Sequence, residues 1–312
     1  METVRITDVA PRDGLQAEGG VVETGRKADL VRAIEGAGVD EVEVSSFVSP
    51  KWVPQLGDAA ELFGLIAGGK PEGMIYSALV PNERGLEGAL AVNADARQRA
   101  TLGGGAERLI DKVAVFTAAS EGFSQKNTNA SIAETLERFA PLIPRAKEQG
   151  LMVRGYVSCI VRCPFDGDVS SEQVGDVVGE LLKLGVDEID LGDTIGAGDP
   201  DSIEQVLLEV MERLDGRAVN DFGDPTLTLH LHDTFGNAGA CIERALEVGV
   251  RSFDSSAGGL GGCPYASTET TRAPGNVSTL AVLDAVERMG MKTNVDREVM
   301  EKASVFAEGL IQ

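Results

Sequence analysis

The chain contains only two histidines, His230 and His232, which stand two residues apart in the apolar stretch T-L-T-L-H-L-H-D. This stretch predicts a β-strand. Alternate residues of a strand point to the same face, so we expect the two imidazoles to converge. Imidazole is a common metal ligand, and Asp13 can add a carboxylate. Two imidazoles with oxygen ligands suit Mg2+, Mn2+ or Co2+, whereas a closed structural zinc site would contain more sulfur. The alternative is a hydrogen-bonded pair of core histidines.

Other polar residues recur at the ends of predicted strands. They are Arg12 and Asp13 after the first strand, Glu43, Ser45 and Ser46 in the second, Ser158 in the fifth, Asp193 and Thr194 after the sixth, and the segment G-G-L-G-G-C-P-Y after the eighth. The carboxyl ends of the strands form the active site of a (β/α)8 barrel. If the strands close into such a barrel, all these residues meet at one mouth.

The elements that would position these residues are eight alternating strands and helices, which indicate a closed parallel barrel. We expect strands at residues 4–9, 39–45, 74–80, 111–116, 152–157, 188–191, 226–232 and 252–256. We expect helices at residues 24–36, 58–67, 84–91, 131–148, 171–184, 201–214, 238–248 and 279–289. The predicted fold class is therefore α/β, a single (β/α)8 TIM barrel. One catalytic domain would span residues 1–312, with the barrel at about 3–290 and an extra C-terminal helix at about 295–310. Residues 93–108 form an insertion or a longer helix and loop.

Composition limits the classes of partner. The net charge is −22, from 50 acidic and 28 basic residues, which disfavours nucleic acid and anionic membranes. No stretch approaches the ~20 apolar residues of a membrane span. The first residues show no signal peptide, so we expect a cytoplasmic protein. Four cysteines in a chain of 312 residues make no disulfide framework, and we expect Cys159 and Cys163 to be packed thiols.

Several long, ordered motifs carry a family resemblance. They are P-R-D-G-L-Q at 11–16, S-S-F-V-S-P-K-W-V-P-Q at 45–55, R-G-Y-V-S-C at 154–159, L-G-D-T-I-G at 191–196, H-L-H-D-T-F-G at 230–236 and A-G-G-L-G-G-C-P-Y-A at 257–266. From about residue 4 to residue 289, the chain resembles the 3-hydroxy-3-methylglutaryl-CoA lyase family. The R-D-G and H-x-H motifs also mark a wider metallolyase superfamily that includes isopropylmalate and citramalate synthases.

The resemblance implies a role for each matching residue. The implied metal ligands are Asp13, His230, His232 and Asn276. The implied catalytic residues are Arg12 beside the thioester carbonyl, the acidic residues Glu43 and Asp193, and the lid-loop thiol Cys263. The family divides 3-hydroxy-3-methylglutaryl-CoA into acetyl-CoA and acetoacetate, so the resemblance implies an acyl-CoA substrate and a divalent cofactor, Mg2+ or Mn2+, with Co2+ as a further candidate. We also expect a homo-oligomer, a dimer or a tetramer.

The chemistry of that cleavage agrees with these roles. A retro-Claisen reaction needs a base for the tertiary hydroxyl and stabilisation of the departing thioester enolate. A divalent ion that chelates the hydroxyl lowers its pKa, and a permanently charged Arg12 suits the enolate oxygen. Cys263, on its glycine-rich loop, is a candidate to protonate the enolate. A plain flexible turn is the alternative for that loop. Glu43 and Asp193 could equally orient Arg12 or a histidine.

Contacts with the rest of the substrate rest on weaker signals. We expect the substrate to be bound by Gln16, Ser46, Phe47, Lys51 and Thr194. Lys51, Arg154 and Arg162 are candidates for the CoA phosphates, although surface salt bridges explain each equally well. Gln16 is followed by A-E-G-G, where the family often has a lysine. Two alternatives remain: a superfamily enzyme for a longer 3-hydroxyacyl-CoA or a hydroxy-keto acid, with Phe47, Val48 and Tyr156 around the pocket, and a non-catalytic binding protein on the same barrel.

Overall fold

Eight parallel strands close into a barrel in the computed structural model, which describes residues 2–262 and 274–311. The strands, in their order around the barrel, are β1 (Arg5–Asp8), β10 (Ser252–Ser255), β9 (Leu227–Leu231), β8 (Glu188–Asp193), β5 (Met152–Ser158), β4 (Lys112–Ala118), β3 (Ile75–Leu79) and β2 (Glu41–Ser46). All eight neighbouring pairs are parallel, including β1 with β2, the pair that closes the barrel. The predicted fold class is thereby confirmed.

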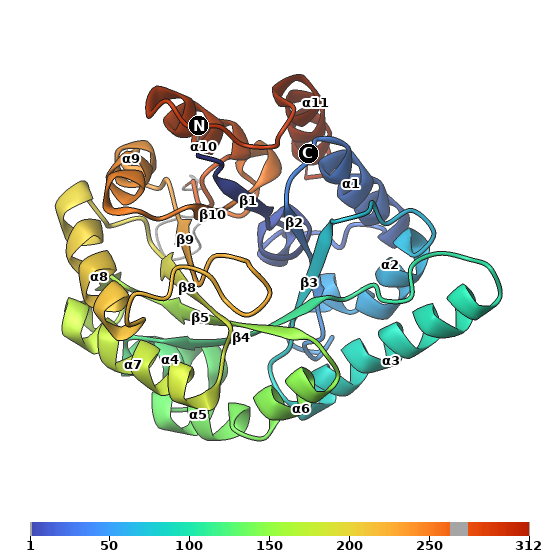
Figure 1. Cartoon of the computed structure of the whole chain (residues 1–312), viewed down its shortest axis with the longest axis horizontal. Helices are drawn as coiled ribbons and strands as arrows, with labels where there is room; N and C mark the ends of the chain where they lie inside the picture. Colours follow the sequence, from blue (N-terminus) through green and yellow to red (C-terminus); the bar gives the residue numbers. More distant parts are fainter. Residues whose placement is uncertain (1, 263–273, 312) are drawn as a thin grey trace.

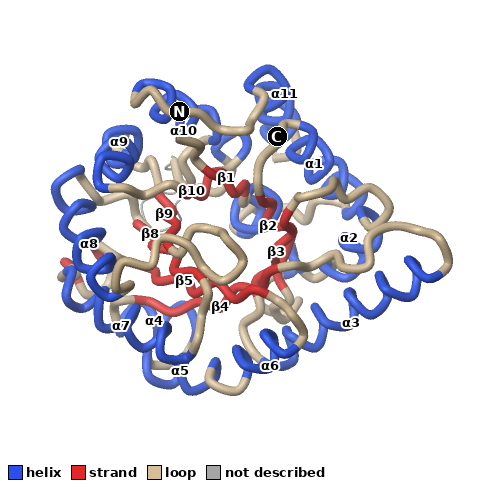
Figure 2. Tube along the Cα trace, viewed as in Figure 1, coloured by secondary structure: helices blue, strands red, loops and turns tan. Residues whose placement is uncertain are grey.

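A ring of helices surrounds the strands, as Figures 1 and 2 show. These helices are α1 (Thr24–Gly36), α2 (Ala59–Ile66), α3 (Glu83–Thr101), α4 (Glu121–Thr128), α5 (Ile132–Phe139), α6 (Leu142–Glu148), α7 (Ser171–Leu184), α8 (Pro200–Arg213), α9 (Ala238–Val248), α10 (Thr279–Arg288) and α11 (Arg297–Glu308). In Figure 1, α11 lies beside α1 near both chain ends. Within the described residues, no helix combines the length and apolar character that a membrane span requires.

Local signals in the sequence explain where these helices begin and end. Ser170 caps α7 in a reciprocal capping box with Gln173, and Gly185 ends the helix in the left-handed conformation that glycine adopts without strain. Asp199 and Ser202 form the corresponding box at the start of α8. These caps fix the points at which the chain leaves the strands and returns to them.

One prediction about the helices needs correction, and one open alternative is decided. The helix expected at residues 131–148 is two helices, α5 and α6, which meet at Pro141, because proline lacks the N–H that a continuous helix requires. For residues 93–108, the structure confirms the second alternative, a longer helix and loop. Helix α3 continues to Thr101, and the return loop is held by Asn93, whose side chain accepts from the backbone N–H groups of Leu109 and Ile110.

The interior of the barrel holds charged residues, which we call the interior charge cluster: Glu41, Lys112, Arg154, Glu188, Asp190 and Asp254. Lys112 Nζ lies 2.6 Å from both Glu41 Oε2 and Glu188 Oε2. Arg154 Nη2 lies 2.7 Å from Glu188 Oε1, and its Nη1 lies 3.1 Å from Asp254 Oδ1. Buried charges are tolerated when they are paired in this way.

A loop between α8 and β9 covers the amino-terminal end of the barrel. It passes in front of the strands in Figure 1, and its Asp224 Oδ1 lies 2.6 Å from Arg5 Nη1 at the start of β1. Asn220 stabilises the turn in this loop by accepting from the backbone N–H groups of Phe222 and Asp224. The interior charge cluster is therefore closed off at this end.

Candidate active site

Two short segments place the predicted metal ligands. Strand β1 runs directly into η1 (Ala10–Gly14), a five-residue π-helical turn that carries Arg12 and Asp13. His230 lies near the end of β9, and His232 follows the strand. Both segments lie at the carboxyl ends of strands, as expected for the functional face of this fold.

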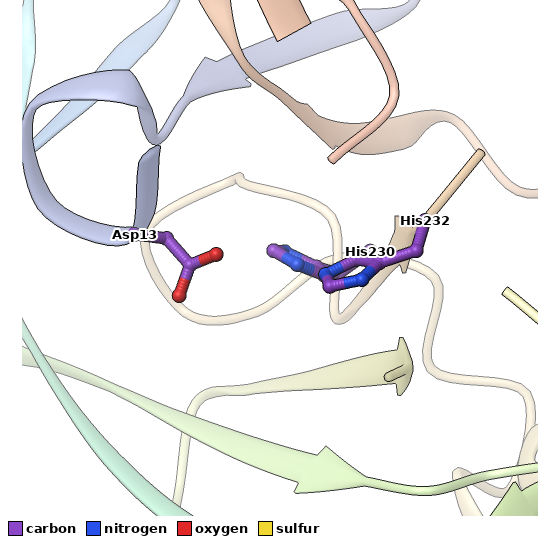
Figure 3. Close-up of side chains that lie close together, drawn as sticks. All are labelled: Asp13, His230 and His232. Atoms are coloured by element: carbon purple, nitrogen blue, oxygen red, sulfur yellow. The ribbon is translucent and has the colours of Figure 1, made fainter. Parts of the chain in front are cut away.

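Asp13, His230 and His232 converge at the mouth. One ligand atom of each lies within 4.8 Å of the other two, and the ring centroids of the histidines are 5.5 Å apart. Figure 3 shows the Asp13 carboxylate facing both rings across the mouth. The predicted convergence of the two imidazoles is present, and the geometry favours a ligand set over a hydrogen-bonded histidine pair.

Asn276 completes this arrangement. Its Nδ2 donates to Asp13 Oδ2 at 2.9 Å and to the Leu260 carbonyl at 3.0 Å. These bonds fix the amide so that Oδ1, which is buried, has no partner within the described residues, and His232 Nδ1 is in the same situation. Buried polar atoms are rarely left unpaired, so an acceptor without a partner beside a carboxylate and two imidazoles fits a divalent cation.

The backbone around Asn276 is packed so closely that three positions require glycine. A Cβ on Gly275 would lie 1.6 Å from the Gly261 carbonyl oxygen, and one on Gly261 would lie 2.6 Å from Asn276 Nδ2. A Cβ on Gly14 would lie 2.9 Å from Leu260 Cβ. These three glycines, which we call the glycine contact, let the segments that carry Asp13 and Asn276 approach each other.

Arg12 lies beside the ligand set and is held by two carboxylates. Its Nε donates to Glu43 Oε2 at 2.5 Å, and its Nη1 donates to Asp13 Oδ1. The guanidinium also lies 5.5 Å from the centroid of the Tyr156 ring. Burial lowers the pKa of Arg12, but Glu43 and Asp13 raise it by more, so the group stays charged. The mouth thus combines a fixed cation with a ligand set.

The ligands differ in protonation. Burial raises the pKa of Asp13, but Arg12 and the histidines outweigh it and lower this pKa to about 2. Burial, aided by His230, lowers the pKa of His232 to about 4. Burial also lowers the pKa of His230, but the hydrogen bond to Asp254 raises it above the ordinary 6.5. At neutral pH, Asp13 is therefore ionised and the His232 ring is neutral.

Asp193 and Thr194 mainly hold the backbone. Asp193 accepts from Gly198 N at 2.8 Å and from Ala197 N at 3.1 Å, and burial, opposed by these bonds, raises its pKa to about 6. Thr194 Oγ1 accepts from Cys159 N at 2.8 Å. The proposed catalytic part of Asp193 and the substrate contact of Thr194 stay predictions.

The other predicted substrate contacts divide into two groups. Gln16 and Lys51 are exposed. Ser46 has no exposed surface, and its hydroxyl donates to the Leu79 carbonyl at 3.3 Å, so the structure gives its predicted contact no support. The ring of Phe47 stacks on Phe63 of α2, with centroids 6.1 Å apart, and its predicted substrate contact stays a prediction.

The CoA-phosphate prediction for Arg154 was wrong. The side chain is 1% exposed and is surrounded by the carboxylates of the interior charge cluster, so an external phosphate cannot reach it. Arg162 is exposed and lies 3.4 Å from Asp168 in the hairpin of β6 (Arg162–Cys163) and β7 (Gly167–Asp168). Cys263, the predicted lid thiol, lies outside the described residues. Cys159 and Cys163 are buried and free, as predicted.

The sequence reasoning missed Asp254, which lies beneath the ligand set. Asp254 Oδ2 is 3.1 Å from His230 Nδ1, and Tyr156 connects Asp254 to Glu43 through its hydroxyl, 3.3 Å from each. Periodicity provides the signal that could have found it, because polar and apolar residues alternate in S-F-D at 252–254, as they do in E-V-E at 41–43 and E-I-D at 188–190. Such alternation places the charges on the inner face.

Fold and site together define a (β/α)8 barrel with a candidate divalent-metal site at its mouth. The family model described as HMGL-like matches residues 3–306, and the chain belongs to this family. A protein of Pseudomonas aeruginosa named 3-hydroxy-3-isohexenylglutaryl-CoA/hydroxy-methylglutaryl-CoA lyase is 43% identical over 305 residues, with 96% of this chain and 90% of that protein covered. The hydroxymethylglutaryl-CoA lyase of Pseudomonas mevalonii is 42% identical, with 98% and 91% covered.

Solved structures agree with this assignment. The HMG-CoA lyase of Brucella melitensis has a TM-score of 0.88 and 41% identity, with all of both chains covered. An HMG-CoA lyase from Acinetobacter baumannii, solved in complex with coenzyme A and 3-methylmalate, has a TM-score of 0.83 and 30% identity, with 99% of this chain and 91% of that chain covered.

Proposed function

We propose that this chain is a carbon–carbon lyase that cleaves 3-hydroxy-3-methylglutaryl-CoA to acetyl-CoA and acetoacetate. The observation that carries the proposal is the position of Arg12, a buried cation held by Glu43 and Asp13 directly beside the converging ligand set. Near-full-length relatives that are named as lyases of this substrate support it. A binding protein would have no use for a cation fixed beside a metal site.

Asp13, His230, His232 and Asn276 are the proposed ligands of the divalent cofactor, Mg2+ or Mn2+, with Co2+ as a further candidate. When bound, such an ion polarises the substrate hydroxyl and fixes its geometry. Asp13 and His232 bind it without losing a proton at neutral pH, because their pKa values are about 2 and about 4. Asn276 contributes through its unpaired buried Oδ1.

Arg12 is the proposed stabiliser of the enolate. Negative charge develops on the thioester oxygen as the carbon–carbon bond breaks, and a fixed cation in a water-poor site stabilises that charge strongly. Glu43 orients Arg12 through the 2.5 Å hydrogen bond to Nε. Cys263 is the proposed acid that returns a proton to the enolate, and Asp193 the proposed acidic group that supports the reaction.

The acyl-CoA must approach a protein of net charge −22. We propose that the exposed, positively charged Lys51 offsets this repulsion locally and that the exposed Gln16 adds a neutral polar contact with the substrate. Nucleic acid and membranes are not proposed partners. We also propose a cytoplasmic homo-oligomer, a dimer or a tetramer, whose mass light scattering would measure.

A longer branched substrate is the second candidate, because the relative from Pseudomonas aeruginosa is named for both 3-hydroxy-3-isohexenylglutaryl-CoA and hydroxymethylglutaryl-CoA. The two substrates differ only in the 3-alkyl group, so the volume beside Arg12 decides between them. A kcat/KM higher for the isohexenyl compound would favour this candidate.

The test of the proposed function begins with protein stripped of metal by a chelator. Acetyl-CoA release from each acyl-CoA is then measured without metal and after addition of Mg2+, Mn2+ or Co2+. From 3-hydroxy-3-methylglutaryl-CoA we expect acetyl-CoA and acetoacetate in equal amounts, only with metal present. No cleavage of either substrate with any of the three ions would contradict the proposal.

A further inference from the structure

His230 and His232 are held in different ways, although both are proposed ligands. His230 Nδ1 lies 3.1 Å from Asp254 Oδ2, and the carboxylate is fully buried. His232 Nδ1 is also buried but has no partner within the described residues. Within the described part of the chain, a carboxylate therefore engages a ring nitrogen of His230 but not of His232, which leaves Nε2 of His230 as the nitrogen available to a metal ion.

Asp254 is itself fixed from the opposite side. Arg154 Nη1 donates to Asp254 Oδ1 at 3.1 Å, and the Tyr156 hydroxyl lies 3.3 Å from Asp254 Oδ2. Arg154 is anchored in turn, because its Nη2 lies 2.7 Å from Glu188 Oε1. A rigid chain of contacts thus leads from the closed end of the barrel to the ring of His230.

We propose that Asp254 is a positioning residue of the metal centre, which holds His230 with its proton on Nδ1 and its Nε2 lone pair facing Asp13. A histidine ligand commonly donates its second N–H to a carboxylate, which sets both the tautomer and the orientation of the ring. This inference rests on the metal site of the proposed function. It adds that the interior charge cluster supports the metal ligands through the contact between Asp254 and His230.

An alternative use of the same residues is a second cation site, because ligand atoms of Asp190, His230 and Asp254 also lie within 4.8 Å of one another. The structure favours the positioning role, since Arg154 already supplies a cation here. Its Nη1 lies 3.3 Å from Asp190 Oδ2 and 3.1 Å from Asp254 Oδ1. We therefore expect one bound ion per chain.

The first test needs no substitution near Asp254. The chain has only two histidines, so a long-range proton–nitrogen spectrum of the metal-free protein shows two rings, recorded at a pH where both are neutral. A His232→Gln variant leaves the signals of His230 alone. We expect the proton of His230 on Nδ1. A proton on Nε2 would overturn the proposal, and this result does not depend on enzymatic activity.

The second test measures Mn2+ affinity and stoichiometry by calorimetry. Asp254→Asn should weaken Mn2+ binding by ~10–100-fold, the range seen when such supporting partners are changed. The control is Glu41→Gln, which removes a buried carboxylate that also contacts Arg154, at 3.4 Å, but does not touch His230. Glu41→Gln should bind Mn2+ as the parent does.

Equal affinity in the parent and in Asp254→Asn would overturn the proposal, as would a second bound ion that Asp254→Asn removes. Thermal unfolding of both variants identifies any that fail to fold, and the histidine spectrum of the parent then decides. A parent protein that binds no Mn2+ but shows the expected His230 tautomer would count against the proposed metal site and not against the Asp254 contact.

Discussion

Buried charged and polar side chains lie at both ends of the barrel interior, but they differ in how completely they are paired. At the closed end, Lys112 is paired with Glu41 and Glu188, each at 2.6 Å. Atoms of Glu41, Arg154 and Asp190 also lack a hydrogen-bond partner there, but each of these side chains is part of an ion pair. At the mouth, Asp13 is partly exposed, and buried atoms of His232 and Asn276, whose side chains form no ion pair, have no partner within the described residues. Paired charges stabilise a fold or at least do not cost it much, whereas unpaired polar atoms cost stability unless a ligand binds them. The difference separates a structural cluster from a binding site that the same barrel encloses.

The largest expected effect follows from a change at the mouth. Asp13→Ala or His232→Ala should remove the bound divalent ion and the lyase activity together, because each deletes one of the converging ligands. Metal content and acetyl-CoA release, measured on the same preparation, check this. Asp168→Ala, at an exposed carboxylate of the hairpin, is the control and should retain both. Full metal content in both mouth variants would rule out the assigned ligands.

Arg12→Gln should keep the metal ion but lower kcat by ~10²–10³ or more, because a neutral amide cannot match the enolate charge. Steady-state kinetics combined with metal analysis check this prediction. Arg213→Gln, at an exposed arginine of α8, should have parental kinetics. Near-parental turnover in Arg12→Gln would show that this arginine does not stabilise the enolate.

Lys112→Met should lower the free energy of unfolding without changing the affinity for the metal ion. It leaves two buried carboxylates with less compensation, and breaking a buried pair typically costs ~3–5 kcal/mol in the free energy of unfolding. Lys183→Met, at a surface pair with Glu180, should change it by no more than ~0.5 kcal/mol. Denaturant titration measures both values. If Lys112→Met weakened Mn2+ binding while the protein remained folded, the ion pairs at the closed end would also support the metal ligands at the mouth.

The smallest effect concerns pH. Among the three titratable ligands, only His230 has a raised pKa, since burial lowers it but the bond to Asp254 raises it by more. Asp13, with a pKa of about 2, is already ionised, and His232, with a pKa of about 4, is already neutral. Metal affinity should be full above the pKa of His230 and fall about tenfold per pH unit below it, because one proton competes with the ion. Mn2+ titrations at several pH values measure this slope, and a twofold steeper slope would mean that two protons are displaced.

The strands could be predicted because apolar β-branched runs and glycine-ended helices repeat along the chain. The convergence of His230 and His232 followed from strand alternation alone. The split between α5 and α6 was missed although Pro141 marks it, and α4 and the β6–β7 hairpin carry no strong periodic signal. The interior position of Arg154 could have been inferred, because it shares a strand face with Tyr156.

The remaining parts of the site could not be derived from sequence, since they depend on contacts between distant residues. The bond between His230 and Asp254 spans 24 positions, and the bond between Asn276 and Asp13 spans 263. Phe47 follows a buried strand in the manner of a pocket residue, and only the packing of α2 and α3 turns its ring toward Phe63. Local sequence patterns predict on which face of a strand or helix a residue lies, but they do not predict which distant residue it contacts.

The glycine contact has a consequence for the interpretation of inherited or engineered variants. Gly14, Gly261 and Gly275 carry no reactive group, yet a single methyl group at Gly275 would overlap the Gly261 carbonyl oxygen. A substitution there would displace Asn276, although the gene would still encode every reactive side chain. A method that examines only catalytic and ligand positions would therefore classify such a variant as neutral. We expect the variant to lose function all the same, because Asn276 would be misplaced.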